Sequence, residues 1–277
     1  MSYKRLLTIQ DISCVGQCSL TVALPIISAC GIETAVLPSA VLSTHTAGFS
    51  GYTFRDLTED MPSIKDHWIK ENLKFDAIYT GYLGSTKQID YVADIFETTG
   101  KEKCIKIVDP AMADNGNLYP GFDKEFVEAM KALCGKADFL VPNITEASFL
   151  TDMEYKKEYD REYIDELIKK MRALGAKNII LTGVSYESGK TGVVVFENNE
   201  YKYYEHKFLP NSCHGTGDIY ASAFAGALVR GKDAYTAAKI AADYTVECIK
   251  ATAEEENHWY GAKFEPVLGK LIKLIEE

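Results

Sequence analysis

The order of apolar and amphipathic segments limits most strongly what this chain can fold into. Five short runs are apolar without alternation and end in polar residues or glycine, which is typical of strands buried on both faces of a parallel sheet. These runs are residues 5–11, 76–82, 104–110, 138–143 and 177–183. Amphipathic segments between them predict helices at residues 63–73, 86–100, 123–135 and 160–175. The alternation predicts an α/β fold, a doubly wound and mostly parallel central sheet with helices on both faces.

One segment departs from this alternation. In residues 191–208 two β-rich runs flank Asn198-Asn199, a pair that tolerates the left-handed conformation of a tight turn. The segment therefore predicts a small antiparallel hairpin. No Pro/Ser-rich linker, repeat or low-complexity tract interrupts the chain, so we expect residues 1–277 to form one domain.

Polar residues follow nearly every predicted strand, and two of them are acidic. In sheets of this type a ligand binds beyond the carboxyl ends of the strands, so these residues predict one shared site. They are Asp11, Thr80-Gly81-Tyr82, Asp109-Pro110, Asn143 and Thr182-Gly183. A single polar strand end is ordinary, and the prediction depends on their number.

The stretch NSCHGTGDIYASAFAGALVRG, residues 211–231, predicts an anion site at the start of a helix. Gly215, Thr216 and Gly217 form a turn whose backbone a ligand can approach closely, and a helix of small residues follows as far as Gly231. Helix N-termini favour anions because their first N–H groups are unpaired. Asp218 at the same turn is either a helix cap or a base that acts beside a bound anion.

These elements match the needs of phosphoryl transfer, which are donors for the moving group, acidic ligands for Mg²⁺ and a base near the acceptor hydroxyl. The Gly-Thr-Gly turn supplies donors, and Asp218 supplies the base. The candidate metal ligands are Asp109, Asp114 and Glu146. Asn143 and Glu146 also fit a capping box, a role compatible with a metal contact.

Charge and motif content exclude several other functions. A formal net charge of −10 argues against sequence-independent binding of nucleic acid or anionic membranes. The chain has no P-loop, no G-x-G-x-x-G after its first strand, and no apolar run long enough for a membrane span. Its seven cysteines are scattered without a C-x-x-C pair, so we expect no zinc site and a reduced, cytoplasmic setting.

Five motifs occur in an order that resembles the pyridoxal kinases of the ribokinase-like superfamily, and this resemblance covers nearly the whole chain. They are STHTAG, TGY after a strand, VDPAMAD, VPNITEA, and GTGD leading into the small-residue helix. The resemblance implies ATP-dependent phosphorylation of the 5′-hydroxymethyl group of a B6 vitamer by a homodimer that uses Mg²⁺ and K⁺.

The resemblance also implies roles for individual residues. Asp218 would be the base, and Gly215, Thr216 and Gly217 the anion hole. Metal and phosphates would be held by Asp109, Asp114, Asn143 and Glu146. Thr182 and Gly183 would lie by the nucleotide, while Thr46 and Tyr82 would line the vitamer pocket.

Two residues leave alternatives open. Many pyridoxal kinases carry a serine where this chain has Asp11, and an acid there resembles the hydroxymethylpyrimidine kinases of thiamin synthesis. Asp11 could pair with a ring nitrogen or amino group, so the vitamers and hydroxymethylpyrimidine all remain candidate substrates. Cys213 could add to an aldehyde substrate if the helix terminus and His214 lowered its pKa, or it could be a packing residue, which we favour. A non-enzymatic vitamer-binding protein is the alternative from another class.

Overall fold

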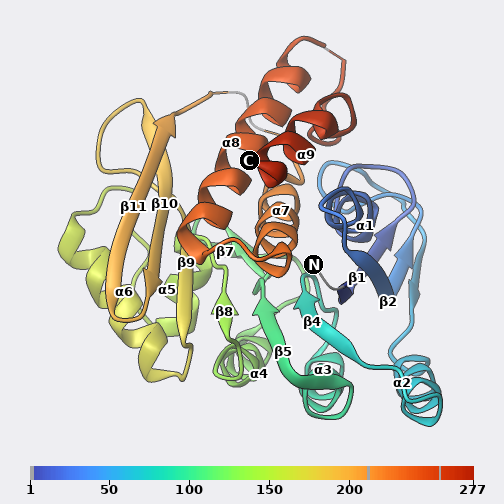
Figure 1. Ribbon diagram of the computed structural model, residues 1–277. Coiled ribbons are helices and arrows are strands. Elements are labelled where there is room, and N and C mark those ends of the chain that lie inside the picture. Colours follow the sequence, from blue (N-terminus) through green and yellow to red (C-terminus); the bar gives the residue numbers. More distant parts are fainter. Residues whose placement is uncertain (1–2, 211–212, 256) are drawn as a thin grey trace.

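The computed structural model describes residues 3–210, 213–255 and 257–277, and its centre is a nine-stranded sheet in the order β11-β10-β9-β8-β5-β4-β1-β2-β3 (Figure 1). The strands are β1 (Arg5–Ser13), β2 (Glu33–Leu42), β3 (Phe54–Asp56), β4 (Phe75–Thr80), β5 (Gly100–Val108), β8 (Phe139–Leu140), β9 (Asn178–Val184), β10 (Lys190–Glu197) and β11 (Glu200–Lys207). A separate two-stranded sheet pairs β6 (Ala113–Asp114) with β7 (Asn117–Leu118).

Helices cover both faces of the large sheet (Figure 1). They are α1 (Leu20–Ala29), α2 (Met61–Lys70), α3 (Thr86–Thr98), α4 (Lys124–Cys134), α5 (Ile144–Thr151), α6 (Arg161–Ala173), α7 (Thr216–Arg230), α8 (Ala234–Ala253) and α9 (Leu268–Glu276), with a 3-10 turn at Glu265–Val267. One apolar cluster joins the sheet to α1, α7, α8 and α9, and a second joins it to α2 through α6. The doubly wound α/β fold predicted from the alternation is confirmed.

The sheet is parallel in its centre and antiparallel at both edges. Strands β9, β8, β5, β4, β1 and β2 run parallel to their neighbours, while β3 and β10 pair antiparallel. The predicted hairpin is β10–β11, and its turn residues Asn198 and Asn199 have φ of 53° and 64°. Because β10 also pairs with β9, the hairpin extends the main sheet.

The structure corrects the sequence analysis at several boundaries. Strand β2 and helix α8 were not among the expected elements, and α3 ends at Thr98, so that Gly100 begins β5. Asp11 does not follow β1 but lies inside it, where the pairing with β2 shifts register between Gln10 and Ile12. Such a bulge re-aims the side chain at its centre, which explains how a residue within a strand can face the site.

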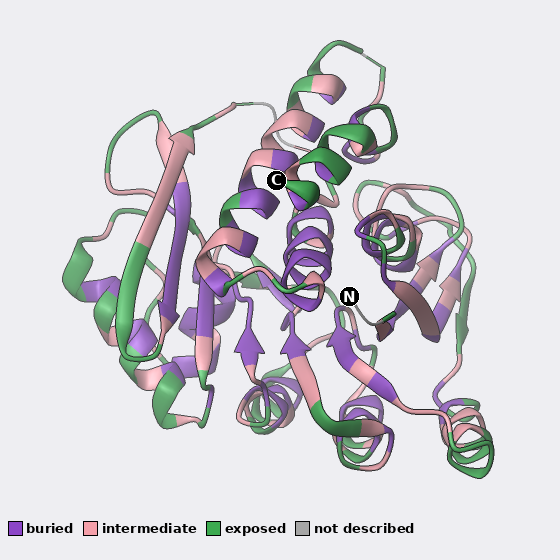
Figure 2. Ribbon diagram, viewed as in Figure 1, coloured by how far each residue is buried: buried purple, intermediate pink, exposed green. Residues whose placement is uncertain are grey.

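Helix α7 is buried along nearly its whole length in the middle of the molecule (Figure 2). Its small residues are required by close packing against α1, since a Cβ at Gly226 would lie 2.5 Å from the Sγ of Cys30. No helix in the part of the chain that the structure describes is long and apolar enough to cross a membrane. The tight fit of α7 fixes the position of its N-terminus at the carboxyl edge of the sheet.

Two fully buried tyrosines make a matched test of this core. Within the described residues, the hydroxyl of Tyr79 on β4 lies near the side chains of Ser222 and Gln10 but makes no hydrogen bond of regular geometry, whereas Tyr244 on α8 donates to the carbonyl of Phe264 over 3.0 Å. Removing an unpaired buried hydroxyl removes the free-energy cost of its desolvation. Removing a paired hydroxyl leaves its acceptor buried without a hydrogen bond. We expect Tyr79→Phe to raise the free energy of unfolding by about 1 kcal/mol and Tyr244→Phe to lower it by about 1 kcal/mol. Urea unfolding of both variants measures this, and equal signs would contradict it.

Candidate active site

The N-terminus of α7 is open to a ligand. Its N-cap is Gly215, which adopts the left-handed conformation (φ 77°), and no side chain caps the helix. A Cβ at Gly215 would lie 1.9 Å from the carbonyl oxygen of Gln17, so only glycine fits there. A Cβ at Gly217 would meet nothing within 4 Å. The first turn of α7 therefore has no side-chain cap in the part of the chain that the structure describes, as an anion site requires.

Asp218 is the third residue of α7 and not its cap, which removes the simpler of the two interpretations of the motif. Burial raises the pKa of Asp218 to about 7, and the carboxylate of Asp11 adds to this effect. The backbone N–H of Ser19 donates a hydrogen bond that opposes the shift. A carboxylate with a pKa near neutrality can take a proton from an alcohol and release it again.

Two further carboxylates lie next to Asp218. Asp109 directly follows β5, and Glu146 stands in the first turn of α5; they are only 8% and 3% exposed. Burial, reinforced by the charges of Glu146 and Asp218, raises the pKa of Asp109 well above its ordinary value. Burial likewise raises the pKa of Glu146 to about 8. The three acids share one buried corner and repel one another.

The predicted capping box at Asn143 and Glu146 is present. The backbone N–H of Glu146 donates to Oδ1 of Asn143 over 2.9 Å, and that of Asn143 donates to Oε2 of Glu146 over 2.8 Å. Oε1 of Glu146 accepts from the backbone N–H of Met112 over 3.3 Å. These bonds fix the carboxylate of Glu146 relative to the turn after β5 and leave lone pairs on both oxygens.

Tyr119, which the sequence analysis did not identify, lies close enough to the acids for their charges to act on its hydroxyl. Burial raises the pKa of its hydroxyl, and four carboxylates raise it further, those of Glu146, Asp114, Asp109 and Asp218. Asp114 itself is exposed and accepts hydrogen bonds from the backbone and side chain of Asn115 over 2.8 and 2.9 Å. One exposed and three buried acids therefore lie around a single tyrosine.

The donor set fits a cation that is shared with another ligand. Among the described residues, no group of three or more His, Cys, Asp or Glu side chains is arranged to hold a metal by itself. Asp109 accepts no hydrogen bond within the described part of the chain, so its buried charge lacks compensation. Mg²⁺ commonly takes one or two carboxylates and completes its shell with phosphate and water, which suits Asp109, Asp114 and Glu146.

A cavity of about 380 Å³ opens beside these acids, within the size range of small-molecule sites. Its lining includes four predicted nucleotide or metal residues: Asp114, Asn143, Thr182 and Gly183. Asn143 pairs with Thr182 in an isolated bridge, which joins the start of α5 to β9. The lining also includes Tyr155, Lys157, Tyr159 and Phe208, which the sequence analysis missed because they lie in segments without a motif or period.

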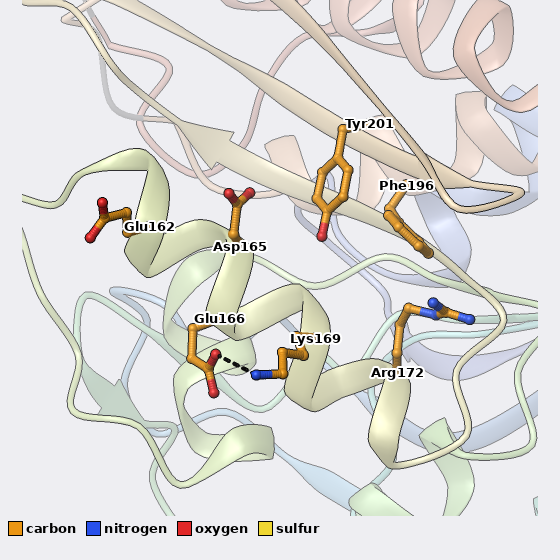
Figure 3. A pocket seen from close by; sticks show the side chains of 7 residues that line it. All are labelled: Glu162, Asp165, Glu166, Lys169, Arg172, Phe196 and Tyr201. Atoms are coloured by element: carbon orange, nitrogen blue, oxygen red, sulfur yellow. Dashed lines mark hydrogen bonds and ion pairs between the residues drawn. The ribbon is translucent and has the colours of Figure 1, made fainter.

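A second cavity, of about 410 Å³, lies between α6 and the β10–β11 hairpin (Figure 3). It contains none of the predicted site residues. Its two cations already have partners, because Lys169 donates to Glu166 over 3.4 Å and the guanidinium of Arg172 lies 4.9 Å from the ring centroid of Phe196. We therefore place the site at the edge that carries the acids.

Asp11 and Tyr82 are the two predicted substrate residues whose surroundings the structure links to Asp218 and to each other, because the charge of Asp11 acts on both Asp218 and Tyr82. Asp11 is 5% exposed and accepts from the hydroxyl of Ser13 over 2.9 Å, and burial raises its pKa. Burial raises the pKa of Tyr82 to about 12, and the charge of Asp11 contributes. The ring of Tyr82 lies 5.5 Å from that of Phe122. An acid and an aromatic ring thus lie close together, as a polar heteroaromatic substrate requires.

Thr46 is exposed on the segment after β2, next to a histidine that is fixed in place. Nε2 of His45 lies 2.5 Å from the carbonyl oxygen of Tyr260, and its Nδ1 accepts from the backbone N–H of Ala47 over 3.2 Å. His45 also contacts the rings of Phe49 and His214. His45 is therefore a packed and hydrogen-bonded histidine.

Cys213 does not have the environment of a reactive thiol. Burial raises its pKa, while a hydrogen bond with Thr252 opposes the shift, so the suggested activation by the helix terminus and His214 is not supported. Cys213 packs against the apolar cluster that contains α7. Cys18 lies nearer to the acids, but burial and the charges of Asp218 and Asp11 raise its pKa as well. Both thiols fit packing roles.

Asp218 gives the free energy of unfolding a specific pH dependence. Its pKa is about 7 in the folded protein against an ordinary value of 3.8, so the folded protein binds a proton more tightly than the unfolded chain. This contribution is fully present below about pH 4 and is lost as the pH rises to about 7. We expect wild type to lose up to about 4 kcal/mol relative to Asp218→Asn over that range. Urea unfolding without Mg²⁺ from pH 4 to 8 measures the difference, and parallel pH curves would contradict it.

Comparison with known proteins also indicates a kinase. Residues 26–263 match the model of a family described as phosphomethylpyrimidine kinase. A pyridoxal kinase of Dictyostelium discoideum is 27% identical over 246 residues, which are 82% of this chain and 78% of that protein.

Two solved structures share the fold over nearly all of both chains. The pyridoxal kinase of Lactobacillus plantarum has a TM-score of 0.91 and 30% identity, and the match covers 99% of each chain. A Bacteroides thetaiotaomicron protein classed as a phosphomethylpyrimidine kinase, in a crystal form with pyridoxal, has a TM-score of 0.91 and 35% identity and covers 100% of this chain and 96% of its own. This chain therefore belongs to the phosphomethylpyrimidine kinase family and is a kinase of the pyridoxal kinase type, with the ribokinase-like fold.

Proposed function

We propose that this kinase transfers the γ-phosphoryl group of ATP to the 5′-hydroxymethyl group of a B6 vitamer. The observation that carries the proposal is the position of Asp218, whose pKa is about 7, at the uncapped N-terminus of α7. The charge of Asp218 acts on the buried Asp109, and the charge of Asp11, which acts on Asp218, also acts on Tyr82. Phosphoryl transfer needs phosphate and metal ligands, a base and an acceptor site close together.

In this proposal each part of the site has a separate role in the reaction. The cavity beside α5 binds ATP, with Asn143, Thr182 and Gly183 in its wall. The N–H groups of the Gly-Thr-Gly turn stabilise charge on the group being transferred. Asp218 accepts the proton of the acceptor hydroxyl, which makes the oxygen a better nucleophile.

Asp109, Asp114 and Glu146 would hold Mg²⁺. When bound, Mg²⁺ neutralises phosphate charge and aligns the phosphate oxygens. These side chains are suited to that role because burial and mutual repulsion disfavour the ionised state of Asp109 and Glu146 in the absence of a cation. A cation between them compensates the charge that the protein leaves unpaired.

The name of the matched family supports a second candidate, a hydroxymethylpyrimidine kinase. Asp11 favours this alternative, because a buried carboxylate is a strong acceptor for the amino group of a pyrimidine. The relatives known as pyridoxal kinases, and the neighbour with pyridoxal in its crystal, support the vitamer. A non-enzymatic vitamer-binding protein would have no use for a base with a pKa near 7 beside an anion site.

Turnover by the wild-type protein and by Asp218→Asn tests the proposal. We expect ADP release in Mg-ATP and potassium with at least one of pyridoxal, pyridoxamine and pyridoxine, and a kcat about 10²- to 10⁴-fold lower in the variant. The asparagine keeps the shape of the side chain but cannot accept the proton. Turnover with hydroxymethylpyrimidine alone would establish the second candidate. Vitamer binding without ADP release would favour the carrier.

Asp11→Asn tests how the acceptor is chosen. The variant keeps the size of the side chain and removes its charge, so substrates that carry an amino group lose a charge-assisted hydrogen bond. We expect kcat/KM to fall by about 10- to 100-fold for pyridoxamine and hydroxymethylpyrimidine, and by less for pyridoxine. The KM for ATP should stay unchanged. Equal losses of kcat/KM for all acceptors would show that Asp11 does not distinguish between their ring substituents.

A further inference from the structure

Charged side chains are few in the cavity beside α5. Only three of its lining residues among those described carry a formal charge, and they are Asp114, Lys157 and Lys190. The chain as a whole has a net charge of −10, and the nearest buried groups are acids. A polyphosphate that enters this cavity therefore meets a negative environment unless a specific cation offsets it.

The two lysines differ in what already surrounds them. Nζ of Lys190 lies 2.8 Å from a carboxylate oxygen of Glu187 and 2.7 Å from one of Glu205, so its charge is compensated within the hairpin. Lys157 is exposed, and within residues 3–210, 213–255 and 257–277 its ammonium makes no ion pair or hydrogen bond. Of the cations on this wall, Lys157 is the one whose charge is available to a ligand.

The segment that carries Lys157 is anchored on both sides of it. On one side, Tyr155 packs against Gly116, where a Cβ would lie 2.7 Å from Cδ1 of the tyrosine. On the other, the hydroxyl of Tyr159 donates to the carbonyl of Gly183 over 3.3 Å and accepts from the backbone N–H of Ser185 over 2.9 Å. The two tyrosines line the cavity, and Lys157, which lies between them in the sequence, lines it as well.

The neighbouring lysine provides a contrast within the same segment. Nζ of Lys156 lies 5.2 Å from the ring centroid of Tyr163 on α6. Lys156 is not part of the cavity wall. Two adjacent residues of equal charge therefore have different surroundings. The difference between them comes from where the chain places each side chain and not from local net charge.

We propose that Lys157 binds the phosphate groups of the nucleotide in this cavity, as a point charge that the sequence motifs do not include. The inference rests on the proposed ATP site and extends it. An ammonium with three donors and no carboxylate partner suits a polyphosphate, which offers several acceptor oxygens. Together with the N–H groups at the start of α7, this contact makes the phosphates, rather than the nucleoside, the more tightly bound part of the nucleotide.

Calorimetric titration of the full-length protein with ADP and with adenosine, in EDTA, separates phosphate binding from binding of the nucleoside. We expect Lys157→Met to weaken ADP binding about 10-fold or more, since a hydrogen bond between charged groups is lost. Adenosine affinity should change less than twofold, Lys157→Arg should keep most of the ADP affinity, and Lys156→Met should match wild type.

Four outcomes would overturn the proposal. Unchanged ADP affinity in Lys157→Met would show that the ammonium does not reach the phosphates. An equal loss for ADP and adenosine would place Lys157 at the nucleoside or assign it a structural role. An equal loss in Lys156→Met would indicate surface charge in general. Failure of the wild-type protein to bind ADP would instead remove the nucleotide site itself, and with it the proposed function.

Discussion

Repulsion among three buried carboxylates is the interaction on which the rest of the site depends. Asp109, Glu146 and Asp218 come from three different parts of the chain, yet each raises or shares in the raised pKa of another. Placing acids together in this way lowers stability, and proteins accept such arrangements where chemistry needs them. Burial and the charge of Asp11 raise the pKa of Asp218 to about 7, while burial and the charges of Glu146 and Asp218 raise the pKa of Asp109.

The scaffold around these acids is rigid where the site needs rigidity. Close packing of α7 against α1 fixes the anion site, because Gly226 leaves no room for adjustment against Cys30. The capping box at Asn143 fixes the start of α5, and the bridge to Thr182 joins it to β9. The cavity wall at Tyr155, Lys157 and Tyr159 is instead a loop that is anchored through its tyrosines, whereas the other lysine of the wall, Lys190 on β10, is paired with Glu187 and Glu205.

The resemblance to pyridoxal kinases and the family match agree on the chemistry and leave the acceptor as the open question. In our proposal Asp11 bears on that question, and it lies where the pairing of β1 with β2 shifts register. Its charge acts on the hydroxyl of Tyr82, whose ring can stack on either a pyridine or a pyrimidine.

Much of the fold could be predicted because its signals are local. Buried parallel strands read as short apolar runs, and α3, α4 and α6 fell within two residues of their expected bounds because each is amphipathic. Strand β2 was missed, since Pro38 interrupts its pattern, and α8 was missed because its alanine-rich sequence has a weak period. The Gly-Thr-Gly-Asp turn was recognisable because glycine at a positive φ and an acid in a first helical turn are properties of a few adjacent residues.

The sequence by itself therefore determined the layered architecture, and it singled out the Gly-Thr-Gly turn and the acids as candidates for the site. Only the tertiary structure decided their proton affinities, because a pKa shift depends on burial and on charges brought in from distant strands and helices. It also decided that Asp218 is not a cap, that Cys213 is shielded, and that Lys157 rather than Lys156 borders the cavity. These properties depend on distances between residues that are far apart in the chain, or on the direction of a side chain. The order of residues in the sequence specifies neither directly.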